Sequence, residues 1–167
     1  MFQTSLNHGT EIDIETRALL EYLCQQSGKI YNTGIYFARQ TFFKTGKLLT
    51  GKFDLAFEPS VAKSLLAQSM PSTPMQQTLM SVTESFKSFK NLKDLYIKGQ
   101  LHFRPKPPGY LKSSKLFKVA YPNSGGQRPK LIDGQLRFAL GTTVKRWFGV
   151  SEFFLTFFTV FGQGVSI

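Results

Sequence analysis

A proline-rich break in the middle of the chain limits the possible folds more than any other feature. Residues 104–110 read Arg-Pro-Lys-Pro-Pro-Gly-Tyr. They cannot form a helix, because proline lacks an amide donor and fixes the φ angle. Apolar residues recur at helical spacing before this break and in short strand-like runs after it. The chain is therefore predicted to have a helical first part and a strand-rich second part.

Two helices are predicted in the first 70 residues. Acidic residues at positions 11, 13 and 15 favour a helix N-terminus, where they meet the positive end of the helix dipole. Apolar residues then predict a helix from about Asp13 to Phe43, with Cys24 on its apolar stripe as a small core residue. A shorter helix is expected over Ser60–Ala67.

The third helix has the clearest signals. Thr73 is expected to cap it, with Pro74 at the first helical position and Gln76 three residues after the cap. An apolar stripe runs from Met75 to Tyr96, and most lysines fall off that stripe. This helix is predicted to bury phenylalanine on one face, to show lysine on another, and to end at residues 98–99.

One strand is predicted before the helices and five after them. The first covers Phe2–His8, and the others cover Lys115–Tyr121, Lys130–Asp133, Gln135–Leu140, Val144–Phe148 and Glu152–Val160. The Asp-Gly pair between two apolar runs is a strong hairpin signal. The layout is a strand, a helical insertion, and then a small barrel or sandwich.

The net positive charge lies in the second half of the chain. The net charge is +11, yet residues 1–86 carry seven basic and seven acidic side chains. Such asymmetry indicates a polyanionic partner, with nucleic acid favoured over an anionic membrane surface. The alternative is a basic surface that only keeps the protein soluble.

The expected compartment is the cytoplasm. The N-terminus does not resemble a signal peptide, and the most apolar stretch, residues 153–161, is too short to span a bilayer. A single cysteine fits a reducing compartment, and one cysteine with two histidines excludes a standard zinc site. No metal, cofactor or membrane partner is predicted.

Basic and aromatic residues alternate around the proline-rich break. Phe103, Tyr110 and Phe117 are interleaved with a set of cations, namely Arg104, Lys106, Lys112, Lys115 and Lys118. Cations neutralise phosphates and aromatic rings stack on bases, so this pattern is typical of nucleic-acid binding. Lys145 and Arg146 add two charges beside Trp147, for which packing inside the barrel is favoured over base stacking.

No catalytic motif is recognisable in the sequence. The chain has no nucleophile elbow and no glycine-rich phosphate loop, and its carboxylates are too scattered for metal-dependent phosphodiester chemistry. His8 and His102 are more simply explained by packing or surface roles. The protein is not expected to be an enzyme.

Several motifs, in order, resemble the N-terminal region of TnpB (OrfB), an insertion-sequence transposon protein. They are Tyr31-Asn32, Pro74–Leu79, Ser85–Phe89, Arg104–Tyr110, Asp133–Leu136 and Val144–Phe148. The resemblance covers roughly residues 6–154. Full-length members of this family are RNA-guided DNA endonucleases related to the type V CRISPR effectors.

The resemblance implies an α+β fold, with a small antiparallel oligonucleotide-binding-like (wedge) β-barrel and a helical recognition lobe inserted after its first strand. Residues 1–10 would be the first strand, 11–99 the lobe, 100–155 the rest of the barrel, and 156–167 a divergent Phe-rich tail. Lobe and barrel would hold a guide RNA and read a short motif beside the DNA target. Lys87, Lys90, Arg104, Lys106 and Tyr110 lie in the matching motifs.

The family's nuclease part has no counterpart in this sequence. In TnpB a RuvC-like domain follows, with three acidic metal ligands and a zinc-binding cysteine cluster. A truncated, non-catalytic TnpB-like protein that binds guide RNA, duplex DNA or both is therefore predicted. The alternatives are a regulatory fragment that competes with a full-length relative or docks onto it, and a non-functional gene remnant. The complete predicted interface is Lys87, Lys90, Arg104, Lys106, Tyr110, Lys112, Lys115, Lys118, Arg128, Lys130, Lys145 and Arg146.

Overall fold

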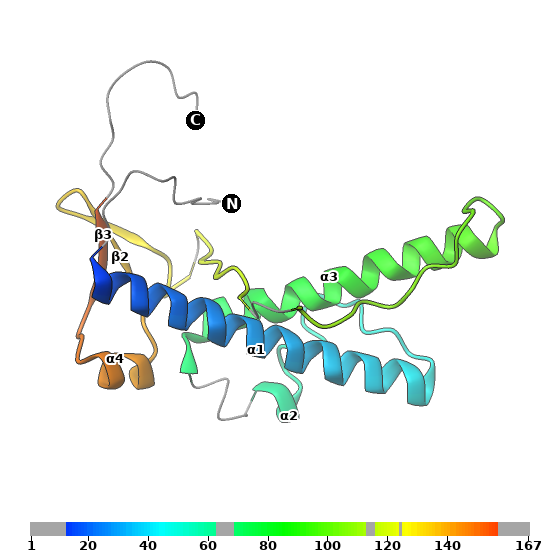
Figure 1. Cartoon of the computed structure of the whole chain (residues 1–167), viewed down its shortest axis with the longest axis horizontal. Coiled ribbons are helices and arrows are strands. Elements are labelled where there is room, and N and C mark those ends of the chain that lie inside the picture. The colour runs from blue at the N-terminus through cyan, green and yellow to red at the C-terminus, as the bar shows by residue number, and fades with distance from the viewer. Residues whose placement is uncertain (1–12, 63–68, 113–115, 124, 157–167) are drawn as a thin grey trace, which may run out of the picture.

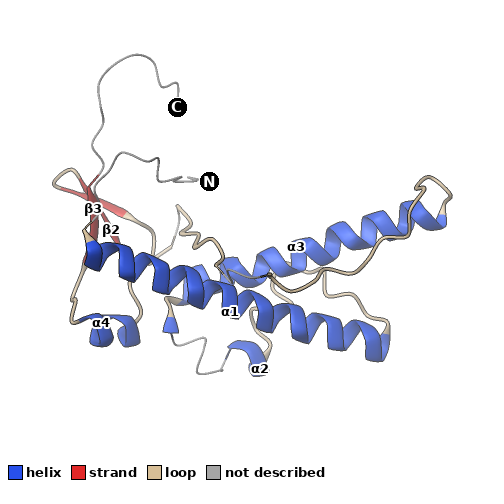
Figure 2. Ribbon diagram, in the orientation of Figure 1, coloured by secondary structure: helices blue, strands red, loops and turns tan. Residues whose placement is uncertain are grey.

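The computed structural model describes residues 13–62, 69–112, 116–123 and 125–156. About half of these residues are helical, and a small sheet lies at one end (Figures 1 and 2). The elements are α1 (Ile14–Thr45), α2 (Pro59–Ala62), α3 (Ser72–Ile97), β1 (Lys130–Ile132), β2 (Gln135–Phe138), α4 (Thr142–Phe148) and β3 (Phe153–Thr156).

Helix α1 confirms the longest helix prediction to within two residues at its C-terminal end. Asp13 caps its N-terminus, and the carboxylate accepts a hydrogen bond of 2.8 Å from the Thr16 amide. That bond stabilises the charged form and lowers the pKa of Asp13. At the other end Gly46 has a φ of 73°, and its amide donates to the Phe42 carbonyl. Glycine adopts this left-handed conformation without steric cost, so the helix ends there.

Helix α3 also forms where it was predicted, but its cap was predicted wrongly. The capping position is Pro71, and Thr73 lies inside the first turn without capping it. Instead, the Thr73 amide donates to the side-chain oxygen of Gln127 at 2.8 Å. A residue 54 positions away therefore satisfies one of the free amides at this helix start.

Helices α1 and α3 run in the same direction and cross in the middle of the molecule (Figure 1). Gly34 of α1 lies at the contact, where an added Cβ would be 3.0 Å from Leu79 Cδ2 and 3.2 Å from Val82 Cγ2. A Cβ at this position would be closer to α3 than most Cβ contacts in proteins, so Leu79 and Val82 would have to shift to admit it. Residues 46–62 of the link between the two helices, which contain α2, turn the chain back from the end of α1 (Figure 1).

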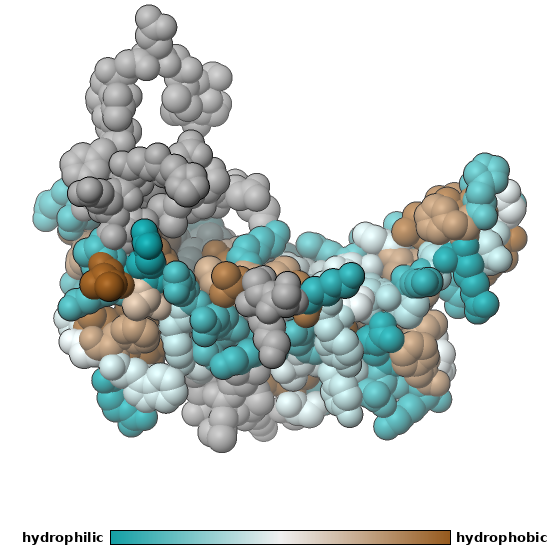
Figure 3. Space-filling model, in the orientation of Figure 1, coloured by the Kyte–Doolittle hydropathy of each residue, from teal (hydrophilic) through white to brown (hydrophobic). Residues whose placement is uncertain are grey.

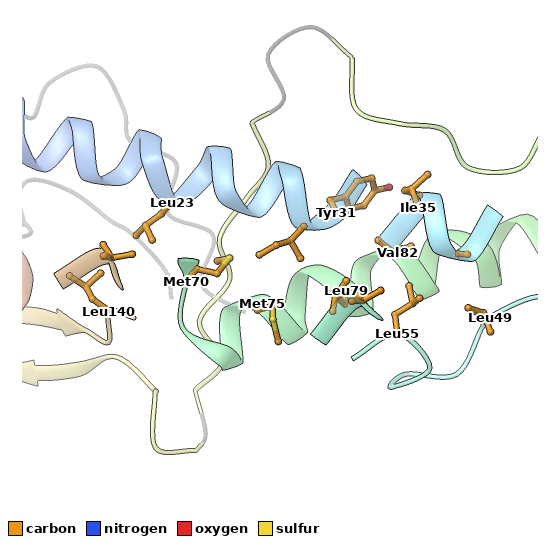
Figure 4. Close-up of a cluster of buried hydrophobic side chains, with 14 of the residues drawn as sticks. Leu23, Tyr31, Ile35, Leu49, Leu55, Met70, Met75, Leu79, Val82 and Leu140 are labelled. Carbon is orange, nitrogen blue, oxygen red and sulfur yellow. The ribbon is translucent and has the colours of Figure 1, made fainter. Parts of the chain in front are cut away.

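One hydrophobic cluster joins the helices to the C-terminal segment (Figure 4). Leu23 and Ile35 of α1 pack in it together with Leu79 of α3, and Leu55 enters from the link between the helices. The C-terminal part contributes Leu140, Val144 and Phe153. Burial of this apolar surface is the main favourable term that holds the parts together.

Residues 100–112 and 116–121, here called the return segment, follow the end of α3 and contact α1 from Pro108 onward. A strand was predicted over Lys115–Tyr121, but residues 116–121 pair with no strand. Their contacts are with α1: the Phe117 amide donates to the Cys24 carbonyl at 3.1 Å, and the Ser27 hydroxyl donates to the Lys118 carbonyl at 2.8 Å. The helix therefore supplies the partners that a neighbouring strand would have supplied.

The sheet is open and small, so the predicted barrel is wrong. Its order is β1-β2-β3, both pairs are antiparallel, and each strand has three or four residues. The Asp133-Gly134 hairpin is confirmed, since both residues have the positive φ that a tight turn requires. Three strands this short cannot close on themselves, because closure needs more strands with a matched stagger.

A second reason why the barrel does not form is that Val144–Phe148, predicted as a strand, belongs to helix α4. Val144, Trp147 and Phe148 are residue types that are common in strands. However, Val144 and Phe148 lie four residues apart in α4, and they belong to the core cluster or pack against it. Helical spacing puts them on one face, and this outweighs local strand propensity.

Parts of three further predictions lie outside the described residues. These are the first strand at 2–8, the second helix beyond residue 62, and the last strand beyond residue 156. Within the described ranges, no helix combines the length and apolarity needed to cross a membrane.

Candidate nucleic-acid interface

The free half of α3 carries the first predicted contacts. The buried stripe of this helix ends at Phe89, and the last two turns project beyond the core (Figure 1). Lys87 and Lys90 are exposed on this projecting part. Lys90 forms an ion pair with Asp94 at 3.9 Å, and both side chains are about half exposed. Such a surface pair contributes little stability, so Lys90 remains able to bind another anion.

The return segment carries the next group. Gly99 has a φ of 72° and reverses the chain after α3. Arg104 and Lys106 then follow on an extended stretch, and both are exposed. The prolines at 105, 107 and 108 fix φ and lower the entropy that this stretch loses on binding.

Arg39 of α1 holds the end of this stretch in place. Its guanidinium donates to the Pro108 carbonyl at 2.8 Å and lies 5.9 Å from the centre of the Tyr110 ring. It also lies 5.2 Å from the Phe43 ring. Tyr110, a predicted contact, is therefore fixed by a cation–π pair while about half of its surface stays exposed.

Lys112 and Lys118 lie further along the return segment, and both are exposed. The backbone beside them is anchored, since the Leu111 amide donates to Asn32 Oδ1 at 2.9 Å and the Lys118 carbonyl accepts from Ser27. Their charged ends are free while their backbone is fixed to α1. Lys115 lies outside the described residues.

The remaining four predicted cations lie at the other end of the molecule. Arg128 precedes the sheet, Lys130 begins β1, and Lys145 and Arg146 are in the last turn of α4. All four are exposed. Because α4 and the sheet lie at the opposite end from the free end of α3 (Figure 1), the predicted set forms two surfaces instead of one. We call residues 87–106 the arm surface, and residues 145–147 the α4 surface.

Sequence reasoning missed three features of the interface. Arg39 was not predicted, because Pro108 and Tyr110, which it holds in place, lie about 70 residues further along the chain. Lys93 and Lys98 belong to the same basic run as Lys87, and the charge count alone indicates them. The third feature is a set of exposed apolar side chains at the free end of α3 (Figure 3), called here the arm tip: Leu92, Leu95, Tyr96, Ile97 and Phe103.

The prediction that Trp147 packs inside a barrel is wrong. Its side chain is 64% exposed, and its ring meets that of Tyr22 edge-on with centroids 5.8 Å apart. The indole therefore lies on the outside of α4, in the helical turn that also contains Lys145 and Arg146.

Chemically, these surfaces offer cations and aromatic rings. Among the described residues, no group of three or more His, Cys, Asp or Glu side chains could hold a metal ion. No family model matches the chain, and no curated protein or solved structure matches it either. The resemblance to TnpB thus depends on the sequence motifs alone.

Proposed function

We propose that this chain is a transposon-encoded, TnpB-like recognition module that binds RNA or DNA in the cytoplasm. Binding would occur mainly through the phosphate backbone, which cations contact regardless of base sequence. The proposed ligands are a guide-type RNA, a duplex DNA target, or both. The proposal assigns binding, and not cleavage, to the residues described above.

The main support for the proposal is that the predicted cations are exposed and almost all lack an ion-pair partner among the described residues. All of those that lie in the described residues are exposed, and among these residues only Lys90 has an ion-pair partner. Cations that serve stability would be expected to pair with carboxylates of the same chain. These are instead free to release their counterions when phosphates replace them.

The arrangement of these cations also supports a long polyanion over a small acidic ligand. Those of the arm surface and the return segment follow one another along the chain, and the other four belong to the segment of the sheet and α4, at the opposite end of the molecule from the free end of α3 (Figure 1). A backbone with evenly spaced phosphates can follow such a row.

Salt-dependent binding tests the proposal directly. Fluorescence anisotropy with a labelled single strand and a labelled duplex should give an affinity that falls linearly on a log–log plot against salt. The variant Lys87→Gln/Arg104→Gln should reduce the slope by about 0.7 per lost contact on a single strand. Lys44→Gln/Lys47→Gln removes two exposed charges from the neutral half of the chain and should leave the slope nearly unchanged. An affinity independent of salt, or no binding at all, would refute the proposal.

The arm tip favours a second candidate, a partner-binding function. Leu92, Leu95 and Tyr96 are exposed at helical spacing on one face of the free end of α3, and Ile97 is 71% exposed on another face. Aliphatic side chains neither stack on bases nor bind phosphates, so nucleic acid does not explain them. A contiguous exposed apolar patch is typical of a protein interface.

Co-purification with a full-length TnpB-like relative distinguishes this candidate from the first. Retention of the relative by the wild type and its loss with Leu95→Ser/Ile97→Ser would support partner binding. Unchanged nucleic-acid affinity in that variant would show that the two activities use different surfaces. A chain that stays monomeric beside the relative would contradict the second candidate.

A further inference from the structure

The α4 surface contains a large aromatic ring that the fold does not bury. Trp147 is 64% exposed, although indole gains more than most side chains from leaving water. The edge contacts that it makes with Tyr22 leave much of the ring accessible. A ring in this state is available to a flat, apolar partner.

The ring is held in place by its surroundings. Tyr22 also meets Phe148 edge-on at 5.5 Å, so the indole is part of a three-ring cluster. Val144 anchors α4 with no exposed surface. The helix ends at Gly149, whose φ is 66°, and the Val150 amide donates to the Lys145 carbonyl at 3.1 Å. This closing turn fixes the position from which Trp147 projects.

Positive charge lies in the same helical turn as Trp147. Lys145 and Arg146 precede Trp147 in the chain, both are exposed, and neither forms an ion pair with a described residue. An aromatic face next to free cations matches the two parts of a nucleotide, namely a base that stacks and a phosphate that carries negative charge.

We propose that Trp147 stacks on an unpaired base of a single-stranded RNA or DNA segment, while Lys145 and Arg146 bind the adjacent phosphates. This inference rests on the proposed nucleic-acid function and names the form of ligand that the α4 surface takes. Duplex bases are already stacked on their neighbours, so their faces are closed to the indole. The α4 surface should therefore prefer single strands, whatever the arm surface binds.

The chain has one tryptophan, so its fluorescence reports on this site alone. A deoxythymidine strand of about 12 nucleotides, within the usual site size, should quench that fluorescence on binding. The control is an abasic strand of equal length and charge, with binding followed by anisotropy of a label. We expect the abasic strand to bind about tenfold more weakly and to leave the fluorescence unchanged.

The outcomes separate the two proposals. Equal affinity for both strands without quenching would refute base stacking and leave the phosphate-binding function intact. Equal quenching by both strands would also refute stacking, because the abasic strand has no base to stack. If neither strand bound, the proposed function would be refuted, and the stacking inference with it.

Substitution gives a second test. Trp147→Leu should weaken binding of the thymidine strand about tenfold and leave the abasic strand unaffected, while Trp147→Phe should retain part of the preference. Phe57→Leu is the matched control, because Phe57 is 70% exposed and lies outside both surfaces. Circular dichroism checks that each variant folds. Unchanged preference in a folded Trp147→Leu variant would refute the inference.

Discussion

At the residue scale, Ser27 shows how one small side chain joins three segments. It is completely buried in α1, its hydroxyl donates to the Lys118 carbonyl at 2.8 Å, and its oxygen lies 2.9 Å from the hydroxyl of Thr78 on α3. Serine is usually unfavourable inside a helix, because its side chain competes for backbone partners. Here that capacity connects α1 to α3 and to the return segment.

Replacing Ser27 by alanine should therefore destabilise the fold. The change leaves the Lys118 carbonyl without its donor and removes the bond to Thr78, so we expect a loss of about 1–3 kcal/mol in the free energy of unfolding. Urea unfolding followed by circular dichroism measures it. Ser88→Ala on the exposed face of α3 is the control and should be nearly neutral. Equal midpoints for the two variants would contradict this account.

Gly34→Ala should also destabilise the protein, although alanine is the better helix former. The new Cβ would lie 3.0 Å from Leu79 and 3.2 Å from Val82, and neither neighbour has exposed surface through which to move. Overpacking costs about 1–3 kcal/mol, against a gain of about 1 kcal/mol in helix propensity. The net loss is read from the urea midpoint.

Gly109→Ala provides the comparison, since an added Cβ there meets nothing within 4 Å. It should leave the midpoint unchanged or raise it slightly by restricting the unfolded chain. If Gly34→Ala behaved in the same way, the close contact between α1 and α3 would be wrong.

At the element scale, the sequence predicts structure well where the causes are local. Helices α1 and α3 and the Asp133-Gly134 hairpin follow from periodicity and turn residues that lie within each element. The return segment and α4 do not, because distant partners decide them. Phe117 and Lys118 form their backbone hydrogen bonds with a helix about 90 positions earlier in the chain, and α4 forms because its apolar face meets the shared core.

The features of the candidate site also divide into those that local sequence predicts and those that only the tertiary fold decides. Exposure of Lys87, Arg104 and Lys106 follows from polar residues that fall off an apolar stripe or lie beside prolines. Their separation from Lys145 and Arg146 depends on the tertiary fold, which no local pattern reveals. Trp147 was misplaced because the strand prediction for its segment gave it an inward-facing position.

Tyr121 connects the return segment to the sheet, and its ionisation is expected to lower the stability of the fold at alkaline pH. Its hydroxyl donates to the Ala139 carbonyl at 2.8 Å, its ring packs edge-on against Phe138 of β2, and burial raises the pKa of the phenol. The folded state therefore holds this proton more tightly than the unfolded state, whose tyrosine titrates near pH 10. The contribution of this phenol to the free energy of unfolding is complete below about pH 10 and is lost as the pH rises above that value.

Tyr121→Phe should lower the free energy of unfolding by about 1 kcal/mol at pH 8. The difference from the wild type should then shrink between pH 9 and pH 11, because only the wild type loses the contribution of this phenol. Urea unfolding at each pH measures the difference. Tyr36→Phe, at an exposed tyrosine on α1, is the control and should follow the wild type throughout. A constant difference across this range would contradict the assignment.

At the scale of the whole molecule, the shared core determines the distance between the two basic surfaces. Leu79 and Val144 belong to one cluster, so the arm surface and the α4 surface are parts of a single body at opposite ends. A strand long enough to reach both would bind them together, and the second contact would gain from a high effective concentration. A short strand would occupy one surface at a time.

Strand length should therefore change how the two sets of cations combine. On a long strand, Lys87→Gln/Arg104→Gln and Lys145→Gln/Arg146→Gln should have additive effects on the logarithm of the affinity, because the sites are far apart and share no partner. On a strand of about six nucleotides, near the lower end of known site sizes, the combined variant should lose more than the two sets separately, since each surface alone can still hold the strand. Anisotropy titrations at fixed salt measure all four proteins. The same additivity at both lengths would mean that the cations bind one continuous path, and that the two ends of the molecule act as one site.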